Sequence, residues 1–452
     1  MRNKIGEIYH KLKHNIIDKD VAIDQIISII DHIQNHKERY EAIKTLATLD
    51  IKHDELFPLL ESLLLSDSNE KIRIHAAKII KNDFLHLAYK PMKWALAHES
   101  SPAVLEQIHE ALMRILKHQK FSKSSDIRKF LIRELDDIEN KEIRVSFKIL
   151  KEKQGIESFS NQDLINILLN YYTLIYLEKT YWRIHYSLEN FKITKLDFIF
   201  KGLTKFPDAI KYLTSLKSLI FRYNQISELP EWIGDLESLE VLNFNVNEIS
   251  SLPNSIGNLG NLEELYLWKN NLKKLPSSVG SLKSLRKLNL RLNYISYLPI
   301  SIGNMSSLKE LNLHDNKLQY LPDSIGQLKS LQKLNLSWNL LEQIPTTIGN
   351  LDSLESLDLG KNELETLPDT IGNLTTLKNL NLSENRLKQL PTSIVDLQNL
   401  EYLNLTRNNL ISLPKNLDSL PNLKELYVGE NQIDSFSTKI KNLEHIGVKI
   451  FF

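Results

Sequence analysis

Asparagine recurs every 23 residues through the second half of this 452-residue chain. Ten successive positions hold it: Asn224, Asn247, Asn270, Asn293, Asn316, Asn339, Asn362, Asn385, Asn408 and Asn431. A period between 20 and 50 residues is typical of a solenoid, in which each structural unit contacts only its sequence neighbours. The spacing therefore predicts a protein that presents a long surface, and it argues against a fold built around one catalytic pocket.

Each asparagine lies in the same pattern, Leu-x-x-Leu-x-Leu-x-x-Asn-x-Leu-x-x-Leu-Pro-x-x-Ile-Gly-x-Leu-x-x, as from Leu285 onward. The Leu-x-Leu alternation predicts a short strand with its leucines facing inward, so that successive units form a parallel sheet. We expect each asparagine amide to be buried, donating to and accepting from the backbone of adjacent coils. The proline should begin the convex side of the unit. The glycine is expected to supply a positive φ for the return turn.

This pattern resembles the leucine-rich repeat family, in the Leu-Pro-x-x-Ile-Gly variant of intracellular Ras-group scaffolds and Roco-type GTPases. The resemblance covers eleven repeats from residue 193 to about 436, counting a first unit in which Lys201 replaces asparagine. It implies an α/β leucine-rich repeat solenoid with a parallel sheet on its concave face. It also implies a protein partner, such as a small GTPase or a signalling enzyme.

The first 153 residues follow a helical period, as in Leu105, Ile108 and Leu112. Related segments recur about every 34 residues, near Arg39, Arg73, Gln107 and Arg144. Segments 67–77 and 140–145 resemble HEAT repeats, which implies stacked helical hairpins. Further along, Ser160 and Asp163 predict a capping box at the start of an amphipathic helix.

We therefore predict three parts. Residues 1–153 form an all-α HEAT-like domain, residues 154–192 a helical cap and junction, and residues 193–452 the repeat solenoid.

Composition limits the possible functions. Lys and Arg total 57 against 56 for Asp and Glu, so bulk charge favours neither nucleic acid nor an anionic membrane. The chain has no cysteine, which excludes disulfides and thiolate metal sites. The amino-terminal residues lack the apolar run of a signal peptide, and no stretch approaches about 18 uninterrupted apolar residues. We expect a cytoplasmic protein.

Motifs for catalysis are missing from the sequence. It has no phosphate-binding Gly-x-x-x-x-Gly-Lys-Ser/Thr loop, no kinase signature and no nucleophile elbow. We therefore expect no enzymatic activity, no catalytic residue and no cofactor. The pairs His10 with His14 and His32 with His36 have a spacing that can bind zinc on a helix. No third ligand is evident, so we interpret them as solvated histidines and expect no metal site.

The candidate binding residues are the two that precede each repeating asparagine, because these positions vary while the frame does not. Bulky aromatic, aliphatic and arginine residues crowd the first six units, and small or charged residues fill the later ones. Aromatic residues and arginine dominate protein-binding hot spots. Ile199 and Phe200 could instead pack under the helical cap. The predicted partner-binding residues are Arg222, Tyr223, Trp268, Arg291, Leu292, His314 and Trp338.

The sequence thus predicts a non-enzymatic scaffold or adaptor that binds a protein on the concave face. Two alternatives remain open. The chain could be a regulatory or inhibitory subunit of a signalling enzyme, which sequence does not separate from a scaffold. It could also bind nucleic acid through its helical half. In residues 1–155 there are 27 basic and 24 acidic residues, and this surplus of three disfavours nucleic-acid binding.

Overall fold

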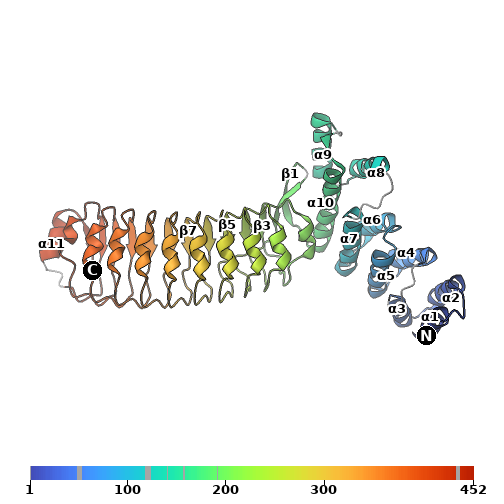
Figure 1. The fold of residues 1–452 in the computed structure, drawn as a ribbon, viewed down its shortest axis with the longest axis horizontal. Coiled ribbons are helices and arrows are strands. Elements are labelled where there is room, and N and C mark those ends of the chain that lie inside the picture. Colours follow the sequence, from blue (N-terminus) through green and yellow to red (C-terminus); the bar gives the residue numbers. More distant parts are fainter. Residues whose placement is uncertain are drawn as a thin grey trace. The chain divides into compact units, whose positions relative to one another are not determined.

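The computed structural model divides into two compact units. The first comprises residues 1–193 with 208–213, and the second residues 194–207 with 214–452 (Figure 1). The predicted three-part division at residues 153 and 192 stays a prediction. No helix in the described part of the chain is long and apolar enough to cross a membrane. The structure describes residues 2–47, 53–117, 124–139, 141–155, 158–190, 192–433 and 438–452.

The first unit is helical, as the apolar spacing predicts. Its helices are α1 (Arg2–Lys13), α2 (Lys19–His32), α3 (His36–Leu46), η1 (Asp54–Leu56), α4 (Phe57–Ser66), α5 (Glu70–Asp83), α6 (Tyr89–His98), α7 (Pro102–Lys117), α8 (Ser124–Asp136), α9 (Lys141–Gln154), α10 (Asn161–Thr180) and η3 (Asp208–Tyr212), and strand β1 is His185–Glu189. The capping box of α10 is confirmed, because the Asp163 backbone N–H donates to Ser160 Oγ and the Ser160 N–H donates to Asp163 Oδ2.

Ion pairs link successive helical hairpins at two of the four recurring positions. Arg39 Nη1 lies 2.8 Å from Asp67 Oδ2, and Arg73 Nε lies 2.8 Å from Glu99 Oε2. At the third position Gln107 is buried and accepts a 2.7 Å hydrogen bond from the Lys81 ammonium. Arg39 and Arg73 therefore each join one hairpin to the next, and at Gln107 the link comes from Lys81, which also pairs with Glu110.

One buried histidine makes the helical unit sensitive to acid. His109 is fully enclosed between α7 and α10, where its Nε2 lies 3.0 Å from Thr173 Oγ1 and its ring stacks on Tyr176. Burial, with a smaller contribution from Lys211, lowers the pKa of His109 to about 3. An unfolded histidine titrates near 6.5. Below that pH the unfolded state binds a proton at His109 and the folded state does not. The free energy of unfolding therefore falls as the pH drops from 6.5 toward 3.

We expect a His109→Gln variant to resist acid better than the natural chain. Between pH 7 and pH 5 the natural protein should lose about 2 kcal/mol of unfolding free energy that the variant keeps, since each pH unit below 6.5 costs about 1.4 kcal/mol. Hydrogen exchange of the amides of α7, corrected for intrinsic rates, measures this difference. Equal pH dependence in the two proteins would show that His109 is protonated while folded.

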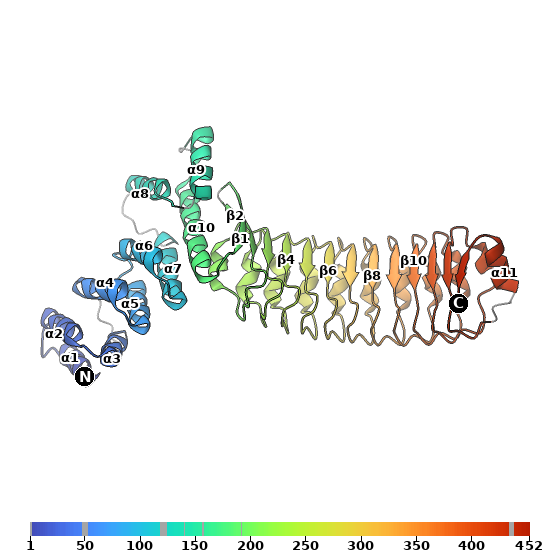
Figure 2. The same cartoon turned by 180° about the vertical axis from the view of Figure 1, so that it is seen from behind.

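The second unit is a stack of short parallel strands in sequence order (Figure 2). The strands are β2 (Lys192–Asp197), β3 (Ser218–Ile220), β4 (Val241–Asn243), β5 (Glu264–Tyr266), β6 (Lys287–Asn289), β7 (Glu310–Asn312), β8 (Lys333–Asn335), β9 (Ser356–Asp358), β10 (Asn379–Asn381), β11 (Tyr402–Asn404), β12 (Glu425–Tyr427) and β13 (Lys449–Phe451). From β2 to β12 paired residues are 23 positions apart, as in Leu288 with Leu311, and residues of β12 and β13 pair 24 positions apart, as in Leu426 with Ile450. Helix α11 (Thr438–His445) precedes the last strand.

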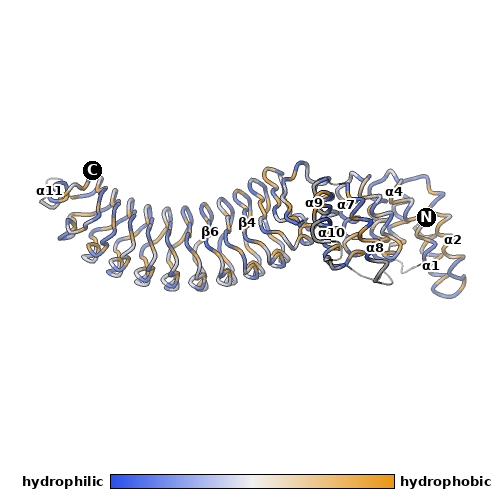
Figure 3. Tube along the Cα trace, turned by 90° about the horizontal axis from the view of Figure 1, so that it is seen from above, coloured by the Kyte–Doolittle hydropathy of each residue, from blue (hydrophilic) through white to orange (hydrophobic). Residues whose placement is uncertain are grey.

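Short 3-10 helices follow the prolines on the opposite side of each coil. They are η4 (Glu231–Asp235), η5 (Asn254–Asn258), η6 (Ser277–Ser281), η7 (Ile300–Asn304), η8 (Asp323–Gln327), η9 (Thr346–Asn350), η10 (Asp369–Asn373), η11 (Thr392–Asp396) and η12 (Leu417–Ser419). The stack bends with the strands on the inner side of the arc, so the sheet forms the concave face (Figure 3). The leucines of the repeat are buried between the two sides.

The asparagine ladder has the predicted bonds. The Asn316 Nδ2 group donates to the carbonyl of Leu290 in the preceding coil and to that of Leu313 in its own coil, at 3.0 Å each. Its Oδ1 accepts the N–H of Ile295, also at 3.0 Å. The same three bonds recur along the stack from Asn247 to Asn431. One side chain thus satisfies three backbone groups and joins two coils.

The repeating glycines do not have the predicted positive φ, and that expectation is wrong. Among the glycines, positive φ occurs at Gly155, Gly202 and Gly447, all outside the repeating Leu-Pro-x-x-Ile-Gly motif. The motif glycines lie in the 3-10 helices, where neighbouring coils come very close together. A Cβ on Gly280 would lie 2.3 Å from the carbonyl oxygen of Ser301 in the next coil. Glycine is needed there for space, because the obstructing atom is backbone and does not move aside.

The position where valine replaces this glycine supports the steric explanation. Val395 precedes a coil whose 3-10 helix, η12, has three residues where the earlier ones have five. Asn416, just before η12, takes a φ of 63°. The coil opposite Val395 is therefore built differently from the coils opposite the motif glycines.

A Gly280→Ala substitution should lower the unfolding free energy by about 1 to 3 kcal/mol, since the added methyl group forces neighbouring coils apart. Gly260→Ala is the matched control, because a Cβ there meets no atom within 4 Å. It should change stability by less than about 1 kcal/mol. Urea denaturation of the full chain compares the two. Equal effects would contradict the steric role.

Candidate functional site

Two columns of side chains lie on the concave face just beyond the ends of the strands. They are formed by the two residues that precede each ladder asparagine, which is the buried asparagine of each 23-residue repeat. The second column has left-handed backbone at every position, with φ between 53° and 59°. These residues are Phe200, Tyr223, Val246, Lys269, Leu292, Asp315, Trp338, Lys361, Glu384, Arg407 and Glu430. Glycine has no Cβ and adopts this conformation readily, and asparagine tolerates it, but other residues rarely do. A β-branched residue such as Val246 is an outlier. The sequence gives no sign of this, because none of the eleven is glycine.

Hydrogen bonds to the next coil hold this unusual backbone. The Val246 N–H donates to the carbonyl of Trp268 at 2.7 Å, and the Lys269 N–H donates to that of Arg291 at 2.9 Å. The parallel ladder thus continues beyond the strand end, and the positive φ then turns the chain toward the ladder asparagine. Every second-column side chain is fixed at the rim by the same turn.

Polar residues at the strand ends support the first column. Asn312 Oδ1 accepts the His314 N–H at 3.0 Å, and Asn335 Oδ1 accepts the Ser337 N–H at the same distance. These bonds close local turns within each coil, whereas Asn381 Nδ2 donates across coils to Asp358 Oδ1 at 2.9 Å.

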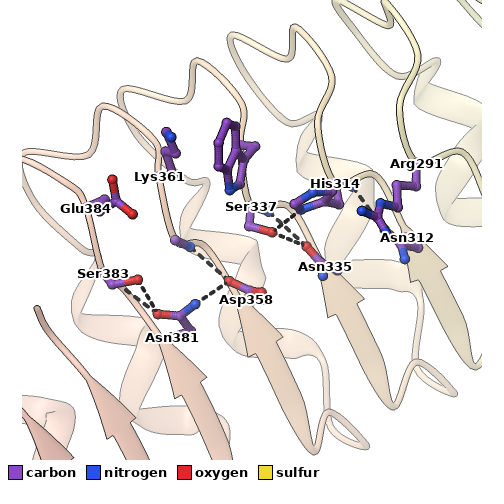
Figure 4. A pocket seen from close by; sticks show the side chains of 12 residues that line it. Arg291, Asn312, His314, Asn335, Ser337, Asp358, Lys361, Asn381, Ser383 and Glu384 are labelled. Carbon is purple, nitrogen blue, oxygen red and sulfur yellow. Dashed lines mark hydrogen bonds between the residues drawn. The ribbon is translucent and has the colours of Figure 1, made fainter. Parts of the chain in front are cut away.

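A shallow polar cavity of about 310 Å³ lies in the middle of the concave face (Figure 4). Its lining residues are Arg291, Asn312, His314, Asn335, Ser337, Trp338, Asp358, Gly360, Lys361, Asn381, Ser383 and Glu384. Small first-column residues form its floor, because Ser337, Gly360 and Ser383 follow the bulkier Arg291 and His314. The hollow is therefore a direct result of side-chain size along one column.

Aromatic and cationic groups stand at the edge of this cavity. Trp338 is 47% exposed, and the Lys361 ammonium lies 3.1 Å from the centroid of its ring. His314 Nδ1 lies 2.8 Å from Ser337 Oγ. Burial, and then the charge of Arg291, lowers the pKa of His314 below its usual value. The imidazole is therefore neutral near pH 7.

The His314 and Ser337 pair does not have the arrangement of a nucleophile and its base. The Ser337 hydroxyl donates to Asn335 Oδ1 at 2.6 Å, so its proton points to an amide oxygen. The serine is also buried, and a lowered pKa makes His314 a weak base. What this geometry offers is fixed hydrogen-bonding groups beside an exposed aromatic ring, which suits recognition of a ligand.

Toward the amino-terminal end of the sheet, the concave face is more aromatic. Phe200 stacks on Tyr223 with ring centroids 4.4 Å apart. Ile199 is half-buried. The Arg291 guanidinium lies 5.9 Å from the centroid of the Trp268 ring.

The seven predicted binding residues therefore divide into two groups on one face. Arg291, His314 and Trp338 line the cavity, whereas Arg222, Tyr223, Trp268 and Leu292 lie outside it. Sequence reasoning missed the polar floor, including Asp358, Asn381 and Ser383. The run of small first-column residues was the available signal, since small side chains between large ones leave a depression.

Metal binding has little support in the described residues. The predicted histidine pairs each use a ring nitrogen locally, with His14 Nδ1 2.8 Å from the His10 carbonyl oxygen and His32 Nδ1 2.7 Å from that of Ser28. A different group, Asp20, His53 and Glu55, places ligand atoms within 4.8 Å of one another. Its two carboxylates are largely exposed, and His53 Nε2 already contacts Asp20 at 3.3 Å.

Comparison with known families gives one match. The family described as leucine-rich repeat region matches residues 205–293, 277–363 and 357–448. The search of curated proteins found no match.

Solved structures provide further similar chains. A leucine-rich repeat protein of Leptospira interrogans is 30% identical over 58% of this chain and 85% of its own, with a TM-score of 0.34. The ectodomain of a plant membrane receptor kinase from Arabidopsis thaliana, solved in complex with Casparian strip integrity factor 2, is 32% identical over 54% of this chain and 32% of its own, with a TM-score of 0.45. An internalin from Listeria monocytogenes is 22% identical over 59% and 91%, with a TM-score of 0.43.

The left-handed column makes a stability prediction at Val246. Replacing it with asparagine, which tolerates positive φ, should raise the unfolding free energy by about 1 kcal/mol. The same substitution at Val241, within strand β4, should lower it, because valine favours extended backbone. Urea denaturation of the two variants decides the question. A loss of stability at both sites would show that the strain at Val246 is negligible.

Proposed function

The chain belongs to the leucine-rich repeat family, and from that premise we propose that it is a non-enzymatic scaffold or adaptor that binds a protein on its concave face. Leucine-rich repeat proteins are generally protein-interaction modules, and their curvature creates extended concave binding surfaces. The observation that carries the proposal is the polar cavity between Arg291 and Glu384, bordered by the exposed aromatic ring of Trp338.

The chemistry of this face supports a protein ligand. Trp338 and Tyr223 are exposed, and each aromatic side chain has only two rotatable angles, so little side-chain freedom is lost when a partner covers them. Tryptophan, tyrosine and arginine are the residues enriched in binding hot spots. The polar floor supplies directional hydrogen bonds, which give specificity. The Trp338 ring beside this floor combines an aromatic contact with hydrogen-bonding groups, and protein interfaces contain both kinds of contact.

The remaining features agree with a binding role inside the cell. The hydrogen bond from Ser337 to Asn335 supports a non-enzymatic site. The absence of cysteine and the intracellular repeat variant support a cytoplasmic location. A small GTPase or a signalling enzyme is the class of partner that the repeat variant favours.

Exchange of Trp268 and Arg291 for alanine should remove the partner. Capture from native lysate of the source cells, followed by mass spectrometry, should show at least a tenfold loss of proteins bound by the natural chain, because hot-spot truncations cost about 2 kcal/mol or more. Both side chains lie on the surface of adjacent coils, so folding should be intact by circular dichroism.

The matched control exchanges Lys274 and Tyr297 for alanine. It also removes one cation and one exposed aromatic residue from adjacent coils, but at positions beyond the ladder asparagines. The control should retain the bound proteins. Equal capture by all three proteins would rule out this part of the concave face as the binding site.

A further inference from the structure

Charge is unevenly distributed along the two columns of the concave face. The first five coils, from Ile199 to Leu292, contain three cations, Arg222, Lys269 and Arg291, and no acidic residue in these columns. From His314 onward, the second column contains Asp315, Lys361, Glu384, Arg407 and Glu430. The amino-terminal part of the face is therefore cationic, whereas the rest is mixed.

Charges at the strand starts are neutralised within the sheet. Glu264 pairs with Lys287 at 3.0 Å, and Glu355 pairs with Lys378 at 2.9 Å, each across neighbouring strands. In the described residues, Arg222, Lys269 and Arg291 take part in no ion pair, whereas Arg286 and Lys287 nearby do. Glu264, which lies in the same coil as Lys269, pairs with Lys287 and also accepts a hydrogen bond from the Tyr266 hydroxyl.

Two buried donors on the same surface have no acceptor. Arg222 Nε and Trp268 Nε1 are both inaccessible to solvent and make no hydrogen bond within the described chain. A buried donor without a partner is unfavourable, and a ligand that supplies an acceptor would satisfy it once the side chain turns toward the ligand. Ionised carboxylates only accept hydrogen bonds and favour arginine in bidentate geometry.

We infer that the partner docks an acidic segment along Arg222, Lys269 and Arg291, with an apolar residue against Trp268. This inference rests on the proposed function and names the chemistry of the partner. Arg222 and Arg291 follow strands β3 and β6, three strand spacings apart, or about 14 Å. An extended peptide covers that distance in about four residues, and residues four apart face the same side. The expected motif is therefore two acidic residues four positions apart with an apolar residue between them.

A peptide is favoured over nucleic acid by the number of charges. Proteins that bind a phosphate backbone tightly make about 6 to 10 phosphate contacts. This surface offers three cations, and the chain as a whole has a net charge of +1. Three cations around one tryptophan instead match a short acidic peptide with one apolar anchor.

The experiment selects peptides on the immobilised full chain from a random library of 12-residue peptides displayed on phage. Enriched peptides should carry the acidic pair at this spacing. Synthetic versions should bind at least tenfold more weakly to an Arg222→Gln/Arg291→Gln variant, and more weakly as salt rises. A Lys273→Gln/Lys274→Gln variant removes the same charge from exposed positions beyond the ladder asparagine and should bind normally.

Several results would overturn the inference. These are enrichment of neutral or basic peptides, equal binding by the two double variants, or tighter binding of a 12-nucleotide single-stranded RNA than of the selected peptides. Peptides whose binding depends on Trp338 and not on Arg222 would overturn the acidic-segment inference while leaving the proposed function intact. Loss of native partners in the lysate experiment is measured separately, so the two proposals can fail independently.

Discussion

The buried amide of the ladder asparagine joins each coil of the second unit to the coil before it. Leucine burial alone would leave neighbouring coils free to slide, because apolar contact has no direction. The amide removes that freedom, since it satisfies two carbonyls and one N–H at fixed distances, as Asn316 does with Leu290, Leu313 and Ile295. Any displacement of one coil would leave buried backbone groups without partners, at about 1 to 3 kcal/mol each.

Because of this constraint, the residues that build the coils, which we call the frame, are distinct from the residues that vary on the concave surface. The ladder bonds fix the coil spacing on the strand side, and the glycines of the 3-10 helices allow close approach on the other side, as at Gly280. Between them, the left-handed turn before each asparagine presents one side chain per coil at the rim. The frame therefore places side chains at regular intervals whatever their identity, and the sequence is free to vary at those positions. The run from His314 to Glu384 uses that freedom to form a cavity.

The sequence was informative wherever one residue type has one physical role. The asparagine period predicted the stack, the parallel sheet and even the bonds of the buried amide, because an amide is the side chain that both donates and accepts there. The role of the repeating glycines was predicted wrongly. Glycine is used both where the backbone needs a positive φ and where a Cβ would not fit, and the sequence does not distinguish the two needs. The left-handed residues were not foreseen at all, because tertiary hydrogen bonds, such as that from Val246 to Trp268, impose the conformation on any residue.

The candidate site was predicted in part for a related reason. Large aromatic and charged residues are easily recognised in a sequence as candidates for binding, so Arg291, His314 and Trp338 were predicted. The cavity depends equally on small residues such as Gly360, which were not. A depression is a property of neighbours in space, and it follows from the 23-residue columns only when they are read for size as well as for chemistry.

Site-specific photo-cross-linking is the most direct test of whether the concave face binds a protein partner. A photoreactive residue would replace Lys361 at the cavity rim in one protein and Thr347 in the 3-10 helix η9 on the opposite side in another. A discrete cross-linked partner is expected from position 361 and none from position 347 when native lysate is irradiated. A partner cross-linked from position 347 alone would contradict binding on the concave face.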